Sequence, residues 1–288
     1  AFTSSFIFTK NHIKPIFYES QYNRYYEEAV FKNDNLKDFN PDIVLIHTTS
    51  KNILNFPGLQ DSKELIKEKL EGELSRYQAI WSKLHSRFNC AIVQNNFELP
   101  RERQLGNMDF TSEFGKTNFI MKLNMEFAVQ AEKTPNLFIN DINYLSSWFG
   151  LERWHDVRFW YSYKYALSYD AIPLLAHNVF KIIASIYGKL QKALVVDLDN
   201  TLWGGVIGDD GIGGIEIGKD TPKGEAHLDF QEYLKGLKQR GIILNICSKN
   251  ELENALEGLD HPANILKLDD FQIIEANWEH KPQNIVSI

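Results

Sequence analysis

The sequence predicts an α/β protein with two parallel-sheet, three-layer domains that cover residues 1–188 and 189–288. Short apolar runs, typical of strands buried on both faces of a parallel sheet, recur along the chain. Between them lie longer segments whose apolar residues recur every three or four positions, the spacing of one helix face. Strands and helices that alternate in this way form parallel sheets. The length of 288 residues also favours two domains.

The strands of the first domain are predicted at 41–46, 90–93 and 137–139, and 11–17 could form a further strand. Residues 18–39 show no clean period, so no element is predicted there. Polar residues, many of them Asn or Thr, follow the first three runs. In an open α/β sheet the carboxyl ends of the strands hold ligands, so these loops mark a possible site.

The helices of the first domain are predicted between and after these strands. A long helix begins near Ser62, and a second one covers Phe119–Ala131. One face of the long helix is formed by Leu70, Leu74, Tyr77, Trp81, Leu84 and Phe88. A last helix carries an apolar stripe over Ile172–Ile186 and is closed by Gly188, a residue type that commonly follows a helix end. The domain boundary is therefore placed near residue 188.

Residues 148–169 are rich in aromatic side chains, among them Trp154, Trp160 and Tyr161. Such a cluster can be a surface for a partner or a part of the hydrophobic core. Core is the more common case, and we expect it here.

The second domain is organised around an apolar strand at 193–196, which we expect to be buried on both faces. Asp197 and Asp199 leave its carboxyl end, followed by Thr201. Two carboxylates at this place can supply a nucleophile, an acid/base group and an anionic seat for a divalent cation.

The rest of the second domain continues the alternation of strand and helix. In order, the sequence predicts a Gly-rich segment at 208–221, a helix closed by Gly241, a strand at 242–247, a helix that starts near Asn250, a strand at 265–268 and a helix that begins near Pro282. Ser248 is the first polar residue after the strand 242–247. Its hydroxyl could be a simple helix N-cap or could bind an anion beside the helix N-terminus.

Composition excludes several classes of protein. The net charge of −7 argues against a general nucleic-acid binder, which usually has a basic surface. Cys90 and Cys247 lie in or beside apolar runs, as reduced, buried thiols of a cytoplasmic protein do. The sequence contains neither a signal-peptide pattern nor an uninterrupted apolar segment long enough for a membrane span. We therefore expect a soluble, cytoplasmic protein without a membrane partner.

The run Asp197-Leu198-Asp199-Asn200-Thr201 resembles the DxDxT motif of the haloacid-dehalogenase (HAD) phosphotransferases. The longer run VVDLDNTLWGGVIGDD resembles the FkbH-like branch of that superfamily, subfamily IIIC. The resemblance implies a Rossmann-like domain with a Mg²⁺ site at Asp197 and Asp199.

The same resemblance implies the roles of the site residues. Asp197 would be the nucleophile that forms an aspartyl-phosphate, and Asp199 the acid/base group. Ser248 and Lys281 would bind the phosphoryl oxygens, and Thr201 and Asn250 would contact the substrate. The Gly-rich segment 208–221 resembles the hairpin flap after the catalytic strand, although an inert surface hairpin is an alternative.

The acidic pair that forms the fourth HAD motif is expected beyond Ile288. Asp269 and Asp270 precede Lys281 and follow the wrong strand, so they are not assigned to this motif. Because Mg²⁺ needs near-octahedral oxygen coordination, we expect weak metal binding and little turnover from these 288 residues alone. Saturation of a magnesium titration below millimolar concentration would contradict this.

The first half of the chain resembles the SGNH-hydrolase-like, flavodoxin-like domain that precedes the HAD domain in FkbH-like proteins. The resemblance places Ser4 or Ser5 near the first turn, Asn52 as an oxyanion donor and His155–Asp156 near the final block. Phe159 stands where the general base belongs. A Ser hydroxyl without a base is a poor nucleophile, so a binding or docking role is expected for this domain.

FkbH-like proteins are associated with removing phosphate from a phosphoglycerate donor and loading the glyceryl unit onto an acyl carrier protein. The resemblance therefore implies a phosphorylated small molecule as substrate and an acyl carrier protein as partner. Two alternatives stay open. One is a small-metabolite phosphatase, and the other is a non-catalytic module that binds a carrier protein.

Overall fold

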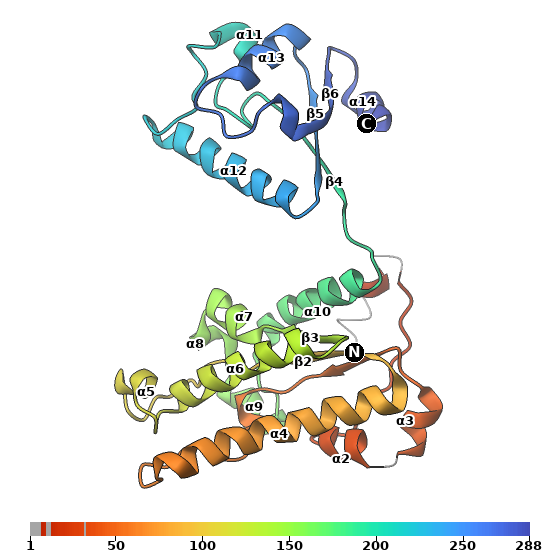
Figure 1. The fold of residues 1–288 in the computed structure, drawn as a ribbon, viewed down its shortest axis with the longest axis vertical. Helices are drawn as coiled ribbons and strands as arrows, with labels where there is room; N and C mark the ends of the chain where they lie inside the picture. The colour runs from red at the N-terminus through yellow and green to blue at the C-terminus, as the bar shows by residue number, and fades with distance from the viewer. Residues whose placement is uncertain (1–6, 10–12, 32) are drawn as a thin grey trace. The chain divides into compact units, whose positions relative to one another are not determined.

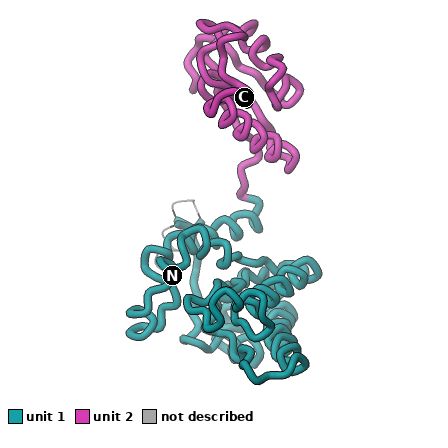
Figure 2. Tube along the Cα trace, turned by 90° about the vertical axis from the view of Figure 1, so that its left-hand side faces the viewer, with its two compact units in different colours: residues 1–188 teal, residues 189–288 magenta. Residues whose placement is uncertain are grey.

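The computed structural model describes residues 7–9, 13–31 and 33–288 (Figure 1). The chain forms two compact units, Ala1–Gly188 and Lys189–Ile288 (Figure 2). Each unit contains its own three-stranded parallel sheet. The prediction of an α/β protein with parallel sheets is confirmed.

The sheet of the first unit is formed by β1 (Ile43–Ile46), β2 (Ala91–Asn95) and β3 (Leu137–Asn140), in that spatial order. The crossovers between the strands contain α4 (Lys63–Phe88) and α6 (Lys116–Lys133). The central strand β2 is buried along its whole length, as its continuous apolar start predicts.

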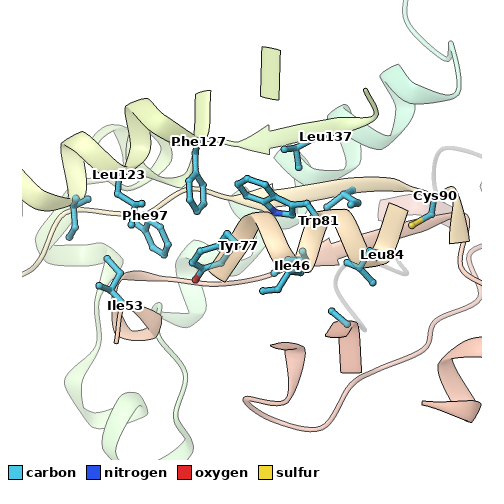
Figure 3. Packing of buried hydrophobic residues seen from close by; sticks show 14 of the residues in the cluster. Ile46, Ile53, Tyr77, Trp81, Leu84, Cys90, Phe97, Leu123, Phe127 and Leu137 are labelled. Carbon is cyan, nitrogen blue, oxygen red and sulfur yellow. The ribbon is translucent and has the colours of Figure 1, made fainter. Parts of the chain in front are cut away.

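The helix α4 begins where its sequence signals place it. The hydroxyl of Ser62 accepts a hydrogen bond from the backbone N–H of Leu65 and caps the first turn. At the other end Asn89 adopts the left-handed conformation that often closes a helix. The helix packs its apolar face into the core of the unit, where the rings of Tyr77 and Trp81 each lie 5.0 Å from the ring of Phe127 (Figure 3).

Shorter helices surround this core. They are α2 (Tyr25–Val30), α3 (Asp34–Phe39), α5 (Met108–Thr111), α7 (Ile142–Phe149), α8 (Leu151–Trp154), α9 (Val157–Tyr163) and α10 (Ile172–Ile186), with 3₁₀ turns η1 (Ser50–Asn52) and η2 (Tyr169–Ala171). The helices α2 and α3 fall in the stretch for which no element was predicted. The strand expected at 11–17 is wrong in its described part, because 13–17 is irregular. Pro15 lacks a backbone N–H for a sheet, and Ile16 is exposed.

The prediction that the aromatic stretch 148–169 is core is wrong for most of its side chains. Trp154 is buried, with 1% of its surface exposed, but Trp148 is 69% and Tyr161 is 76% exposed. The reason lies in the short helices α7 to α9, which each bury at most one side. The helix α9 buries none of its residues.

The sheet of the second unit is formed by β4 (Ala193–Val196), β5 (Ile243–Ser248) and β6 (Phe271–Ala276), in that order. The crossovers contain α12 (Pro222–Gln239) and α13 (Leu252–Asp260). Within the described chain β4 lies at the edge of the sheet, and only Val196 of its residues is buried. The expectation that this strand is buried on both faces is therefore wrong.

The strand expected at 265–268 is also wrong. These residues form a loop that ends in the 3₁₀ turn η3 (Leu268–Asp270), and the strand is β6, a few residues later. The side-chain oxygen Oε1 of Gln231 accepts hydrogen bonds from the backbone N–H groups of Ile265 and Leu266. The apolar side chain of Leu266 is buried in the core. The backbone N–H groups of the loop are hydrogen-bonded to the side chain of Gln231 and not to a neighbouring strand.

The acidic pair Asp269 and Asp270 belongs to the scaffold. The carboxylate of Asp270 contacts Nζ of Lys235 at 2.7 Å and Nζ of Lys238 at 2.8 Å. Burial opposes the charge of Asp270, but the hydrogen bonds from the two lysines outweigh it and lower the pKa of this carboxyl to about 2. That this acidic pair stands outside the candidate site stays a prediction.

The Gly-rich segment 208–221 does not form a regular hairpin. It starts within the short helix α11 (Ile207–Asp210), and a single antiparallel bridge joins Gly204 to Glu216. The carboxylate of Asp210 accepts the backbone N–H of Val206, which closes the turn locally. The chain therefore turns back through a helical turn rather than through two paired strands.

Replacing Gly258 with alanine is expected to destabilise the second unit by about 1–3 kcal/mol, the usual cost of overpacking a core. A Cβ at Gly258 would lie 2.7 Å from Cδ1 of Ile207 and 2.7 Å from Cη2 of the buried Trp203. Urea denaturation measures the change in the free energy of unfolding.

The matched control is Gly236→Ala in α12, where no atom lies within 4 Å of the added Cβ. This change is expected to stabilise the unit by about 0.5–1 kcal/mol through helix propensity. A Gly258→Ala protein as stable as the wild type would show that the packing around Trp203 is loose.

Two further expectations concern burial and membranes. Cys90 and Cys247 are both buried free thiols, as predicted. Among the described residues, no helix combines the length and the apolar character that a membrane crossing requires.

Candidate functional site

The strand ends of the second unit bring four of the predicted site residues close together. Asp197 and Asp199 leave the carboxyl end of β4, and Ser248 is the last residue of the neighbouring strand β5. Lys281 is the first residue of α14 (Lys281–Ser287), which follows β6. The carboxyl ends of parallel strands share one sheet edge, so residues far apart in the sequence meet there.

Two donors hold Asp197. Its Oδ1 accepts the backbone N–H of Leu198 at 2.9 Å and its Oδ2 contacts Nζ of Lys281, while the hydroxyl of Ser248 lies close enough to the carboxylate to affect its pKa. Partial burial raises the pKa of this carboxyl, but the hydrogen bonds from Lys281 and Ser248 outweigh it, so the pKa of Asp197 lies below its ordinary value. The group is therefore a carboxylate at neutral pH.

Asp199 is fixed more tightly. Its Oδ1 accepts the indole N–H of Trp203 at 3.0 Å and the backbone N–H of Ile207 at 3.1 Å, and its Oδ2 accepts the Asn250 amide at 2.8 Å. A carboxylate oxygen has two lone pairs, so Oδ1 is saturated and Oδ2 keeps one acceptor position. The side chain is oriented, with one oxygen left for a further partner.

The anchoring residues Trp203 and Ile207 were not predicted. Trp203 is fully buried, and a Trp in a core usually finds a partner for its N–H. A Trp only two residues after Thr201 could have indicated a side chain close to the site. The sequence alone did not show that its indole N–H donates to Asp199.

Ser248 and Asn250 are both buried. Ser248 does not cap α13, because the N-cap position is occupied by Glu251. The amide nitrogen of Asn250 lies 3.5 Å from Oγ of Ser248 and donates to Asp199, so it connects these two side chains. The amide of Asn250 therefore orients Asp199, and its predicted contact with a substrate stays a prediction.

Thr201 is half-buried beside the site. Its backbone carbonyl lies 2.9 Å from Nδ1 of His227, and its backbone N–H donates to the carbonyl of Leu198. Within the described part of the chain, its hydroxyl makes no recorded hydrogen bond to either Asp197 or Asp199. Its predicted role in substrate binding stays a prediction.

The donor set can accommodate Mg²⁺. Mg²⁺ prefers oxygen ligands and is commonly held by one or two carboxylates together with water and phosphate oxygens. Asp197 can provide a carboxylate oxygen and Asp199 its backbone carbonyl oxygen at the same sheet edge. Among the described residues, no group of three or more acidic, His or Cys side chains is arranged around a common metal position. The fit is therefore to a metal that keeps most of its ligands from water and substrate.

The first unit has its own polar strand ends. Asn178 on α10 donates to Oδ1 of Asn140 at 2.6 Å, and Asn140 donates to Oδ1 of Asn95 at 2.6 Å. The amide nitrogen of Asn95 then lies 2.8 Å from Nδ1 of His47. We name Asn178, Asn140 and Asn95 the amide row. It ties α10 to β3 and β2.

The serine that follows β1 is Ser50, whereas Ser4 and Ser5 lie outside the described residues. The hydroxyl of Ser50 donates to Oε1 of the buried Glu98 at 2.7 Å, and its backbone N–H contacts both carboxylate oxygens. Burial raises the pKa of Glu98 to about 7, against the opposing hydrogen bonds from Ser50. Sequence reasoning missed both residues, because a lone Glu after a strand carries no local signal of burial.

The other residues expected from the SGNH resemblance have local structural roles. The side chain of Asn52 accepts the backbone N–H of Thr49 and closes η1. The carboxylate of Asp156 caps α9 and pairs with Arg158, and the ring of Phe159 packs on Tyr169 at 4.3 Å. These contacts hold the loops of the unit.

The fold and the site define an α/β protein with polar strand ends in each of its units. A family model for the N-terminal domain of FkbH matches residues 9–184. The chain belongs to this family. A search of the curated proteins found no match.

The chain is also similar to a solved structure. This is the crystal structure of the N-terminal part of the protein BF1531 from Bacteroides fragilis, which contains a phosphatase domain and is complexed with Mg. The sequences are 29% identical, the TM-score is 0.89, and the match covers 99% of this chain and 75% of that chain. The likeness extends over both units.

Proposed function

We propose that this chain carries out Mg²⁺-dependent phosphoryl transfer of the HAD type, through an aspartyl-phosphate on Asp197. The observation that supports the proposal most strongly is the contact of Asp197 with Lys281 and Ser248 at one sheet edge. The phosphatase domain in the similar Bacteroides fragilis protein, crystallised with Mg, also supports it.

In the first step a carboxylate oxygen of Asp197 attacks the phosphorus of a phosphate monoester. The new P–O bond to Asp197 forms as the P–O bond to the leaving alcohol breaks, and protonated Asp199 gives its proton to the leaving oxygen. Lys281 and Ser248 move from Asp197 to the phosphoryl oxygens and bind the charge that they carry. The lowered pKa of Asp197 keeps the nucleophile charged before the attack.

In the second step Asp199, now a carboxylate, takes a proton from water as the water oxygen attacks phosphorus. The P–O bond to Asp197 breaks, which releases phosphate and restores both carboxyl groups to their starting states. The three donors that hold Asp199 keep its free acceptor position in place for both proton transfers. A Mg²⁺ ion held by Asp197 and Asp199 would supply positive charge to the phosphoryl group.

The substrate is proposed from the family resemblance. A phosphoglycerate-type donor would lose its phosphate, and its acyl unit would be loaded onto an acyl carrier protein. The first unit, which has no placed SGNH triad among its described residues, would then serve as a docking domain. A simple small-metabolite phosphatase would use the same site without the carrier protein.

The test is Mg²⁺-dependent phosphate release by the full-length gene product from a panel of small phosphate esters and acyl phosphates. Asp197→Asn is expected to abolish the release, because the amide is a poor nucleophile. The matched control is Asp209→Asn, an exposed acid for which no side-chain contact is recorded.

Release that survives in Asp197→Asn would overturn the proposal. Release that depends on Asp197 and is accelerated by acyl carrier protein, with the acyl unit recovered on that protein, would support the transferase. Phosphate release at a rate that does not change when carrier protein is added would favour the phosphatase. No phosphate release from any compound, with or without carrier protein, would favour a non-catalytic binding module.

A further inference from the structure

A cavity of about 290 Å³ lies in the first unit. Its walls come from η1, from the loop after β2, and from the segment that joins α8 to α9. The polar lining includes Ser50, Lys51, Arg101, Lys116 and His155. The cavity is large enough for a small metabolite.

Three cationic side chains line this cavity. Nζ of Lys51 lies 5.4 Å from the ring of Trp160, and Nζ of Lys116 lies 5.3 Å from the ring of Phe56. Among the described residues neither ammonium forms a salt bridge, and the charge of Lys51 acts on the buried Glu98, whose pKa it lowers. A cation that rests on an aromatic face is positioned without being neutralised, so it can still bind an anion.

The acidic side chains at the cavity are already engaged or solvated. The carboxylate of Asp156 pairs with Arg158 at 2.8 Å. Glu102 is largely exposed and lies 3.9 Å from Nε of Arg101, the third cation. The positive charges of Lys51 and Lys116 therefore remain available to an anion in the cavity.

The ring of His155 also lines the cavity. Burial lowers the pKa of His155, hydrogen bonds with the backbone of Leu99 and Ala166 oppose this effect, and the charges of Lys51 and Arg101 lower the pKa further. The protonation of this ring therefore responds to the charges at the cavity.

We propose that this cavity binds the oxyanion of a small molecule, a phosphate or carboxylate group, between Lys51 and Lys116 and beside the ring of His155. The aromatic walls formed by Phe56 and Trp160 would hold the rest of the ligand.

The experiment is an NMR titration of the full chain with inorganic phosphate and, separately, with acetate, in the absence of Mg²⁺. The His155 ring signals are assigned by their loss in His155→Gln. Saturation with a bound anion is expected to raise the pKa of His155, because a nearby negative charge favours the imidazolium. Lys51→Ala and Lys116→Ala are each expected to weaken binding about tenfold, the loss of roughly one charge-assisted hydrogen bond.

The matched control is Lys122→Ala, an exposed lysine on the same helix as Lys116. Its affinity should equal that of the wild type. Phosphate bound only at Asp197 and Lys281 would leave the His155 signals unchanged, so this result overturns the cavity proposal without touching the proposed phosphoryl transfer. The proposal also fails if neither anion moves the His155 signals, or if Lys122→Ala weakens binding as much as Lys116→Ala. A shift of the His155 signals with phosphate alone or with acetate alone supports the cavity proposal and identifies which of the two oxyanions the cavity binds.

Discussion

Replacing Lys281 with alanine is expected to lower kcat/KM for phosphate release by about 10²–10³-fold, the usual effect of removing one preorganised donor to a transition-state oxygen. Nζ of Lys281 contacts Oδ2 of Asp197 from the start of α14. In the proposed mechanism its ammonium group moves from the carboxylate of Asp197 to the phosphoryl oxygens. The measurement is steady-state phosphate release by the full-length protein with Mg²⁺.

Lys281→Ala is also expected to change the pH dependence of kcat/KM for phosphate release. Partial burial raises the pKa of Asp197, and the hydrogen bond from Lys281 is the strongest of the effects that lower it. Without this bond the pKa of Asp197 rises, so a larger fraction of the nucleophile is protonated at mildly acidic pH. The acidic limb of the kcat/KM profile is expected to move to higher pH.

Lys192→Ala is the control, because this exposed lysine precedes the amino end of β4, the opposite end of the strand. It should leave both the rate and the profile unchanged. An unchanged rate in Lys281→Ala would remove Lys281 from the mechanism, and a lower rate without a shift of the acidic limb would separate its binding role from its effect on Asp197.

The stability of the first unit is expected to fall by about 3 kcal/mol as the pH rises from 4.5 to about 7, through the single group Glu98. The pKa of this carboxyl is raised from 4.5 to about 7 in the folded protein. The folded state therefore holds its proton more tightly than the unfolded state does. The resulting contribution is fully present below pH 4.5 and is lost as the pH rises through the folded pKa.

Glu98→Gln isolates this contribution. The glutamine keeps the shape and one acceptor for Ser50 but does not titrate, so the difference in unfolding free energy between wild type and variant should change with pH by about the same amount. His155, whose pKa is lowered, acts in the opposite direction but is common to both proteins. Urea denaturation at a series of pH values gives the difference.

Glu102→Gln is the matched control, because it makes the same substitution at an exposed side chain of the same unit. A wild-type and a Glu98→Gln protein whose stabilities run parallel from pH 4 to 8 would show that Glu98 keeps an ordinary pKa despite its burial.

The sequence predicts a structural element well when the residues that determine the element are neighbours in the chain. The run Ile43–Ile46 is wholly apolar and residues 243–247 are apolar except for Asn245, and both strands were predicted. The strand Phe271–Ala276 contains Gln272 and Glu275 and was missed, while the more apolar 265–268 is a loop. An apolar run reports burial, and burial alone does not separate a strand from a core loop.

The candidate site shows the same limit. Asp197, Ser248 and Lys281 were named from motifs, and the structure brings them together, although their catalytic roles stay predictions. The orientation of Asp199 by Trp203 depends on tertiary packing, which no spacing rule encodes. The burial of Glu98 depends in the same way on contacts with a residue 48 positions away.

The amide row has a direction, which constrains how its members can change. Each amide nitrogen in Asn178, Asn140 and Asn95 points to the next acceptor, so the donors run one way from α10 to His47. An isosteric Asn140→Asp exchange would set two oxygens against each other at Asn95, and rotating one amide would require the others to rotate as well. These positions are therefore expected to diverge as a set during evolution, with compensating changes across strands rather than isolated substitutions.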